Sequence, residues 1–116
     1  MSFFFLLCLT VLYFFAYNRG YKGQCKHKEY ILSKQLLRCG TSIGANVAEA
    51  QKAQSKADFY AKMCIALKET SETMYWLKLL HRTDFLDKAQ FTSLHTDATE
   101  LLYILTAICK TTAQSK

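Results

Sequence analysis

Apolar residues recur at alternating steps of three and four along most of the chain, which is the spacing of one face of an α-helix. The clearest run consists of Phe91, Leu94, Ala98, Leu101, Leu105, Ile108 and Thr112. Asp87 precedes this run and Gln90 follows three residues later, which is a capping-box arrangement for a helix start. The pattern predicts a long helix that packs on its neighbours at a shallow angle.

Two earlier segments show the same periodicity. One follows a second start signal, Ser55 with Asp58, and its inner stripe is Phe59, Met63, Ala66, Thr70, Thr73, Leu77 and Leu80. The other runs from about residue 29 to residue 50, with Leu36, Gly40, Ile43, Val47 and Ala50 at heptad spacing. "HRTD" at 81–84 interrupts the pattern and predicts a short connection. Short connections between long helices indicate antiparallel neighbours.

The first seventeen residues, MSFFFLLCLTVLYFFAY, are apolar on every side, and the first charge is Arg19. A helix of this kind must be buried all round, in protein or in lipid. Residues 3–17 are shorter than the ~20 residues of a spanning helix, and signal-peptide features are lacking. Three interpretations stay open. In the first, residues 1–18 are an atypical first helix that packs with the other predicted helices in a bundle. In the second, residues 3–17 are a membrane anchor. In the third, a wrong gene start or reading frame replaces the native first helix.

Length and composition narrow the fold class. A chain of 116 residues suits a single domain, 1–116, and its 51% hydrophobic content argues against disorder. There are no prolines and only four glycines, so little interrupts long helices and little would make the turns of a many-stranded sheet. The sequence predicts an all-α protein built from four segments.

Positive charge is concentrated near the start of the chain. Of the net charge of +6, residues 1–28 contribute four bases and no acid, whereas the remainder has 11 bases and 9 acids. Such a segment can contact phosphates of nucleic acid or anionic lipid, or it can be a solvated loop. The candidate nucleic-acid contacts are Lys22, Lys26, Lys28, Lys34, Lys52 and Lys56.

The stretch GTSIG, from Gly40 to Gly44, matches the G-x-S-x-G pattern of serine hydrolases. A nucleophile elbow needs a strand directly before the serine and a helix directly after it. The preceding SKQLLRC has neither β-branched enrichment nor alternation, so Ser42 is predicted to lie inside a helix. We expect no catalytic residue here and no enzymatic activity.

Metal and cofactor sites are not indicated either. The five cysteines include no C-x-x-C pair, and the three histidines share no ligand spacing. We expect no metal and no cofactor. The odd number of cysteines on apolar helix faces favours reduced thiols and a cytoplasmic protein. If residues 3–17 are an anchor, the cytoplasmic face of the inner membrane is the alternative location.

Gly40, Gly44 and Ala48 are spaced at i, i+4 and i+8. A helix face without side chains lets another backbone approach closely, as in small-x-x-x-small motifs. A glycine costs about 1 kcal/mol in a helix interior relative to alanine, so the pair calls for compensation. Tight packing along this seam is the prediction, and a helix kink is the alternative.

Polar residues on two helices suggest a network. Glu69 and Glu72 share a face at i, i+3, and two carboxylates repel unless a cation or donor lies between them. Arg38 is predicted to bridge toward them, with Asn46 nearby on the same helix. The alternative is that these residues belong to separate solvated faces.

The string from Tyr30 to Phe59, YILSKQLLRCGTSIGANVAEAQKAQSKADF, with ALKETSETMYWLKLL and ELLYILTAICKTT, resembles the bacterial proteins encoded within intervening sequences of 23S ribosomal RNA genes, formerly labelled ribosomal proteins. The likeness spans about residues 29–112. It implies an antiparallel up-and-down four-helix bundle that assembles as a homopentameric ring, has no enzymatic activity and acts near ribosomal RNA. The apolar start of this chain departs from the family, whose first helix is amphipathic.

Three functional hypotheses follow. The first is a non-enzymatic, self-associating helical bundle that binds ribosomal or other structured RNA through a basic surface. The second is a membrane-tethered helical module anchored by residues 3–17. The third is a hydrolase acting through Ser42, which would react with a serine-directed phosphonate, and we expect no such reaction.

Overall fold

Three helices follow one another with short connections: α2 (Ile31–Ala50), α3 (Lys56–Arg82) and α4 (Lys88–Gln114). The computed structural model describes residues 31–115. Within that range the chain is entirely helix and connection, without a strand. The prediction of an all-α protein is confirmed for this part of the chain.

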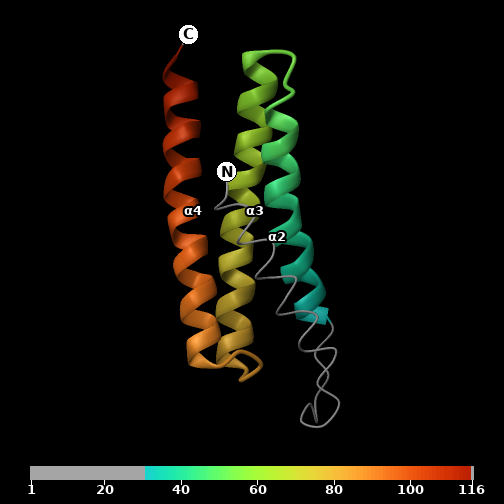
Figure 1. Cartoon of the computed structure of the whole chain (residues 1–116), viewed down its shortest axis with the longest axis vertical. Coiled ribbons are helices and arrows are strands. Elements are labelled where there is room, and N and C mark those ends of the chain that lie inside the picture. The colour runs from blue at the N-terminus through green and yellow to red at the C-terminus, as the bar shows by residue number, and fades with distance from the viewer. Residues whose placement is uncertain (1–30, 116) are drawn as a thin grey trace.

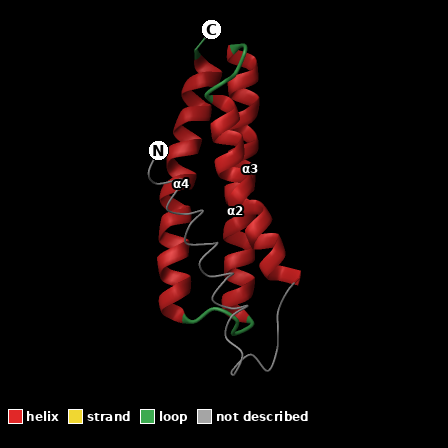
Figure 2. Cartoon of the chain, turned by 45° about the vertical axis from the view of Figure 1, so that its right-hand side comes forward, coloured by secondary structure: helices red, strands yellow, loops and turns green. Residues whose placement is uncertain are grey.

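The helices alternate in direction, and α3 lies in the middle with α2 on one side and α4 on the other (Figure 1). Among the described residues, no Cα atom of α2 comes within 8 Å of a Cα atom of α4. Figure 2 shows these helices after rotation, with a short loop joining α2 to α3 at one end and another joining α3 to α4 at the opposite end. The helices α2 and α4 therefore both pack against α3, and buried side chains of all three helices belong to one hydrophobic core.

Both predicted start signals are present. The Ser55 side chain accepts a hydrogen bond from the Asp58 backbone N–H, 3.0 Å long, at the start of α3. Asp87 and Gln90 form a complete capping box at the start of α4. These bonds satisfy backbone donors that have no partner inside a helix.

The predicted apolar stripes supply the core. The buried positions that the periodicity predicted are Leu36, Gly40, Ile43, Val47 and Ala50 on α2, Met63, Ala66, Thr70, Thr73, Leu77 and Leu80 on α3, and Leu94, Ala98, Leu101 and Leu105 on α4. The ends of two stripes are less buried than predicted, because Phe59, Phe91, Ile108 and Thr112 are half-buried. Thr70 and Thr73 stay satisfied inside the core because their hydroxyls donate to carbonyls one turn earlier.

The connection from α3 to α4 begins two residues later than predicted, because α3 continues through His81 and Arg82. Asp84 has a φ of 66°, in the left-handed region that reverses the chain. Leu86 turns back under the connection and is buried, and its backbone N–H donates to the Leu80 carbonyl. This tight return places α4 directly beside α3.

Candidate functional site

Arg38 joins α2 to α3 through two carboxylates. Its Nη2 donates to Glu72 Oε1 at 2.9 Å, and its Nη1 lies 3.4 Å from Glu69 Oε2. The side chains of Arg38, Glu69 and Glu72 are 50%, 17% and 39% exposed, so water screens the charges only in part. The predicted bridge from Arg38 to the two glutamates is confirmed.

Two further groups belong to this cluster that sequence reasoning missed. Arg38 Nη2 also lies 3.1 Å from the sulfur of the buried Cys39, and Trp76 Nε1 donates to Glu72 Oε1 at 3.3 Å. Trp76 follows Glu72 by one helical turn, so its spacing could have suggested the contact. Cys39 follows Arg38 directly in the sequence, but only the pairing of α2 with α3 brings its thiol toward the glutamates. We call Arg38, Cys39, Glu69, Glu72 and Trp76 the Arg38 cluster.

Electrostatics fix the protonation of the cluster. The hydrogen bond from Arg38 is the main cause that lowers the pKa of Glu72, although burial acts in the opposite direction. Burial is the main cause that raises the pKa of Cys39 to about 12, followed by its hydrogen bond with Glu72. At neutral pH the Glu72 carboxylate is therefore ionised and the Cys39 thiol is protonated. A protonated, buried thiol is a poor nucleophile.

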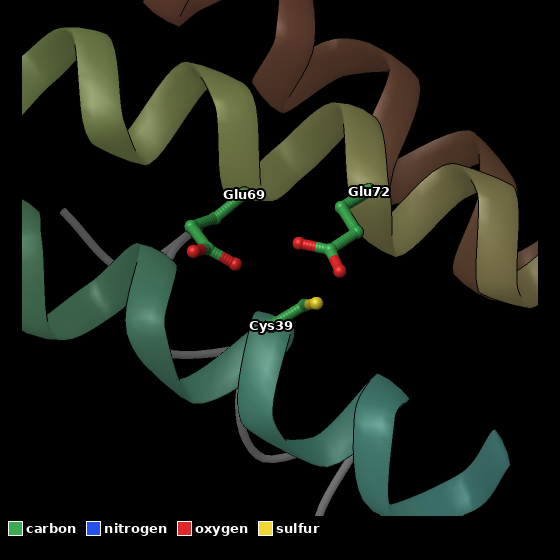
Figure 3. A group of neighbouring side chains, drawn as sticks. All are labelled: Cys39, Glu69 and Glu72. Carbon is green, nitrogen blue, oxygen red and sulfur yellow. The ribbon is translucent and has the colours of Figure 1, made fainter.

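Three groups of the cluster could in principle ligate a metal. One atom each from Cys39, Glu69 and Glu72 lie within 4.8 Å of one another, and Figure 3 shows the Cys39 sulfur facing both carboxylates. Thiolate and carboxylate are common metal ligands. However, the Arg38 guanidinium already contacts all three groups. A metal ion would have to displace that cation and the thiol proton, so the geometry favours an ion-pair connection between helices.

Asn46 does not join the cluster, which corrects the predicted network. Its Nδ2 donates to the Ser42 carbonyl at 2.9 Å and to Ser42 Oγ at 3.1 Å, both within α2. A short amide side chain reaches the carbonyl one turn earlier more readily than a partner on another helix. The prediction that Ser42 lies inside a helix is confirmed, because α2 runs from Ile31 to Ala50 and supplies no strand before Ser42 for a nucleophile elbow.

The glycine seam is only partly as predicted. Gly40 is buried and Gly44 is half-buried, but Ala48 is exposed. Positions eight residues apart on an α-helix differ by about 80° around its axis, which follows from 3.6 residues per turn. The i, i+4, i+8 line therefore turns away from the buried face of α2, and only Gly40 of the three positions is buried.

The candidate RNA contacts do not form one described patch. Lys34 is exposed near the start of α2, whereas Lys52 and Lys56 are exposed at the connection from α2 to α3. The rise of 1.5 Å per residue puts these two places roughly 27 Å apart. Lys56 Nζ donates to Ser115 Oγ at 2.5 Å. Lys22, Lys26 and Lys28 lie outside the described residues.

Among residues 31–115, no helix has both the length and the apolar character needed to cross a membrane. The candidate anchor at residues 3–17 lies outside the described residues, as does the atypical first helix at 1–18. All three cysteines in the described range, Cys39, Cys64 and Cys109, are free thiols.

Comparison with known proteins decides the family. The family described as 23S rRNA-intervening sequence protein matches residues 15–107. This chain belongs to that family. The resemblance inferred from the GTSIGAN region is thus confirmed, and the matched region of the 23S rRNA-intervening sequence protein family begins well before α2.

A solved structure supports the same conclusion. A protein of unknown function from the S23 ribosomal protein family of Bacteroides thetaiotaomicron VPI-5482 is 46% identical to this chain. The alignment covers 90% of this chain and 98% of the other, with a TM-score of 0.71. No curated protein matches this member of the 23S rRNA-intervening sequence protein family.

Proposed function

We propose that this member of the 23S rRNA-intervening sequence protein family is a non-enzymatic helical bundle that assembles with copies of itself and contacts structured RNA in the cytoplasm. In this proposal residues 1–116 form one antiparallel up-and-down four-helix bundle domain, with residues 1–18 as its atypical first helix. The alternating directions of α2, α3 and α4 suit that arrangement, since α2 and α4 both pack against α3 and, among the described residues, have no backbone contact with each other. The family match from residue 15 also supports it.

The observation that carries self-association is the number of large apolar side chains at the surface of α3 and α4. Tyr103 is 70% exposed and Tyr75 is 59% exposed, and Tyr60, Ile65 and Ile104 are also exposed. Isolated apolar groups at a surface are ordinary, whereas large contiguous apolar patches mark contact surfaces, and five large apolar side chains on two adjacent helices support the proposal of such a surface here. Identical copies that bury such a surface form closed symmetric assemblies, and the family resemblance implies a ring of five copies.

Native mass spectrometry and sedimentation velocity at micromolar concentration test self-association. We expect an oligomer for the natural sequence and a dissociation constant raised roughly tenfold or more by Tyr103→Glu, because a carboxylate would be buried in an apolar contact. Ala113→Glu is the matched control, since it adds the same charge to the exposed last turn of α4. A monomer at every concentration for the natural sequence would refute the proposal.

Absence of catalysis is supported by the chemistry of the Arg38 cluster. Its thiol is protonated, and the Arg38 guanidinium contacts both of its carboxylates. The Trp76 ring N–H donates to the Glu72 carboxylate. Each group therefore already has a partner of complementary charge or hydrogen-bonding type. The cluster serves to hold α2 against α3.

RNA contact is supported by the excess of bases over acids, +6 for the whole chain. Phosphate contacts by lysine and arginine release counterions, so affinity should fall steeply as salt rises. Absence of binding to structured RNA at low salt, or binding that is insensitive to salt, would refute this part of the proposal.

A further inference from the structure

Two thiols from different helices are in contact on the side of α3 away from the Arg38 cluster. The sulfur of Cys64, in the third turn of α3, lies 3.7 Å from the sulfur of Cys109, near the end of α4. The two residues are 45 positions apart in sequence, so only the antiparallel pairing of α3 with α4 brings them together. Sequence spacing therefore gave no sign of this pair.

The two thiols differ in access to solvent. Cys109 is 7% exposed, and burial is the main cause that raises its pKa to about 11, followed by its hydrogen bond with Cys64. Cys64 is half-buried, and the partly exposed Tyr60 lies one helical turn before it. A hydrogen bond with Cys64 is the main cause that raises the pKa of Tyr60. The Cys64 side of the pair therefore reaches the surface, whereas Cys109 is held behind it.

We propose that Cys64 and Cys109 are a redox-sensitive pair that closes to a disulfide and locks α3 to α4 when a hydroperoxide oxidises the protein. A disulfide needs a sulfur–sulfur distance of about 2.05 Å and suitable Cβ positions on neighbouring segments. The sulfurs must approach by less than 2 Å, a movement that side-chain rotation can supply. This inference does not depend on self-association or on RNA binding.

The chemistry balances in two steps. The Cys64 sulfur attacks the hydroperoxide, the O–O bond breaks, and Cys64 becomes a sulfenic acid while one molecule of water or alcohol leaves. The Cys109 sulfur then attacks the sulfenic sulfur, the S–S bond forms, and the hydroxyl leaves as water with the Cys109 proton. The two thiols are oxidised by two electrons in total and the hydroperoxide is reduced by two. A thiol such as glutathione reverses the step by exchange.

Closure should be faster at higher pH and should stabilise the fold. The attacking form of Cys109 is the thiolate, and the high pKa of this group makes the thiolate scarce at pH 7. The new bond would constrain the loop between positions 64 and 109 in the unfolded chain. We expect the midpoint of thermal unfolding to rise by at least about 5 °C on oxidation and to return on reduction.

Peptide mapping of the intact chain identifies the bond directly. After treatment with hydrogen peroxide and blocking of free thiols, trypsin should release residues 63–68 linked to residues 89–110. Trypsin cleaves after lysine, and the cuts that define these two peptides follow Lys62, Lys68, Lys88 and Lys110. Intact mass spectrometry should show a monomeric chain lighter by two hydrogens. The linked peptides should separate on reduction, and closure should be faster at pH 8.5 than at pH 7.

Cys109→Ser and Cys39→Ser are the paired variants. We expect Cys109→Ser to abolish the linked peptide and the thermal shift, and Cys39→Ser to keep both, because Cys39 lies on α2 among the Arg38 cluster. If peroxide leaves the natural chain without this linked peptide, the proposal is overturned. That conclusion holds whether Cys64 and Cys109 are then found reduced, over-oxidised or joined to other cysteines, and it needs no variant to fold.

Discussion

At the scale of single residues, Arg38 has the most partners among the described side chains. Its guanidinium contacts Glu69, Glu72 and Cys39, and its Nε donates to Gln35 Oε1 at 3.2 Å. A partly exposed ion pair stabilises a fold by only about 0.2–1 kcal/mol, because water competes for both charges. Loss of Arg38 has a second cost, since it leaves two carboxylates facing each other beside a buried thiol.

Arg38→Gln should therefore lower the free energy of unfolding by about 1 kcal/mol at pH 7, measured by urea denaturation. Lys68→Gln is the control, because Lys68 is an exposed base on α3 outside the three ion pairs of the described residues. We expect the control to change stability by less than half as much. Equal effects from the two variants would show that the bridge adds nothing beyond general charge.

The same variant should change the acid limb of the stability curve. The pKa of Glu72 in the folded protein is lowered from its ordinary 4.5, so the unfolded chain binds the proton more readily. The stabilisation is complete above pH 4.5 and is lost as the pH falls through the folded pKa. Arg38→Gln should flatten the fall in stability below pH 4.5, and an unchanged slope would contradict this account.

At the scale of helices, α2 shows what the sequence could predict. The heptad series through Leu36, Gly40 and Val47 was right because steps of three and four average close to the helical repeat and stay on one face. The series that ended at Ala48 was wrong because repeated steps of four turn away from that face. The heptad periodicity therefore predicted which face of α2 is buried, whereas the repeated four-residue spacing of Gly40, Gly44 and Ala48 did not.

Contacts between helices were predicted less completely. The charge of Arg38 and the paired glutamates suggested their bridge, because like charges on one face need a cation. Nothing in the sequence set the register of α3 against α4, so the contact between Cys64 and Cys109 could not be predicted. The participation of Cys39 in the Arg38 cluster depends on register in the same way.

The same substitution at two glycines tests the revised seam. Alanine gains about 1 kcal/mol over glycine in a helix interior, and an extra methyl group in a packed core costs roughly 1–3 kcal/mol. Gly40→Ala should thus destabilise the protein, since Gly40 is buried, whereas Gly44→Ala should be neutral or stabilising by up to about 1 kcal/mol. Thermal and urea unfolding of both variants measure this. A stabilising Gly40→Ala would show that no backbone or side chain packs closely there.

At the scale of the whole molecule, the distribution of charge decides where RNA could bind. The connection from α2 to α3 carries Lys52 and Lys56 but also Asp58, and Glu49 nearby is paired with Lys62 at 2.7 Å. The start of α2 carries Lys34, and the sequence just before it holds Lys22, Lys26 and Lys28 with Glu29 as its single acid. The positive charge at the start of α2 is therefore less offset by acidic residues than the positive charge at the connection from α2 to α3.

Two double variants of equal charge separate these places. Lys28→Glu with Lys34→Glu and Lys52→Glu with Lys56→Glu each change the net charge by the same amount, so a general loss of attraction affects both alike. We expect the first pair to weaken binding to a structured RNA more strongly, and to lower the slope of log affinity against log salt by about 2, one for each phosphate that a lysine no longer neutralises. Fluorescence anisotropy across a salt series measures both quantities. Equal weakening by the two pairs would indicate that RNA responds only to total charge, and a stronger effect of the second pair would place the RNA at the connection between α2 and α3.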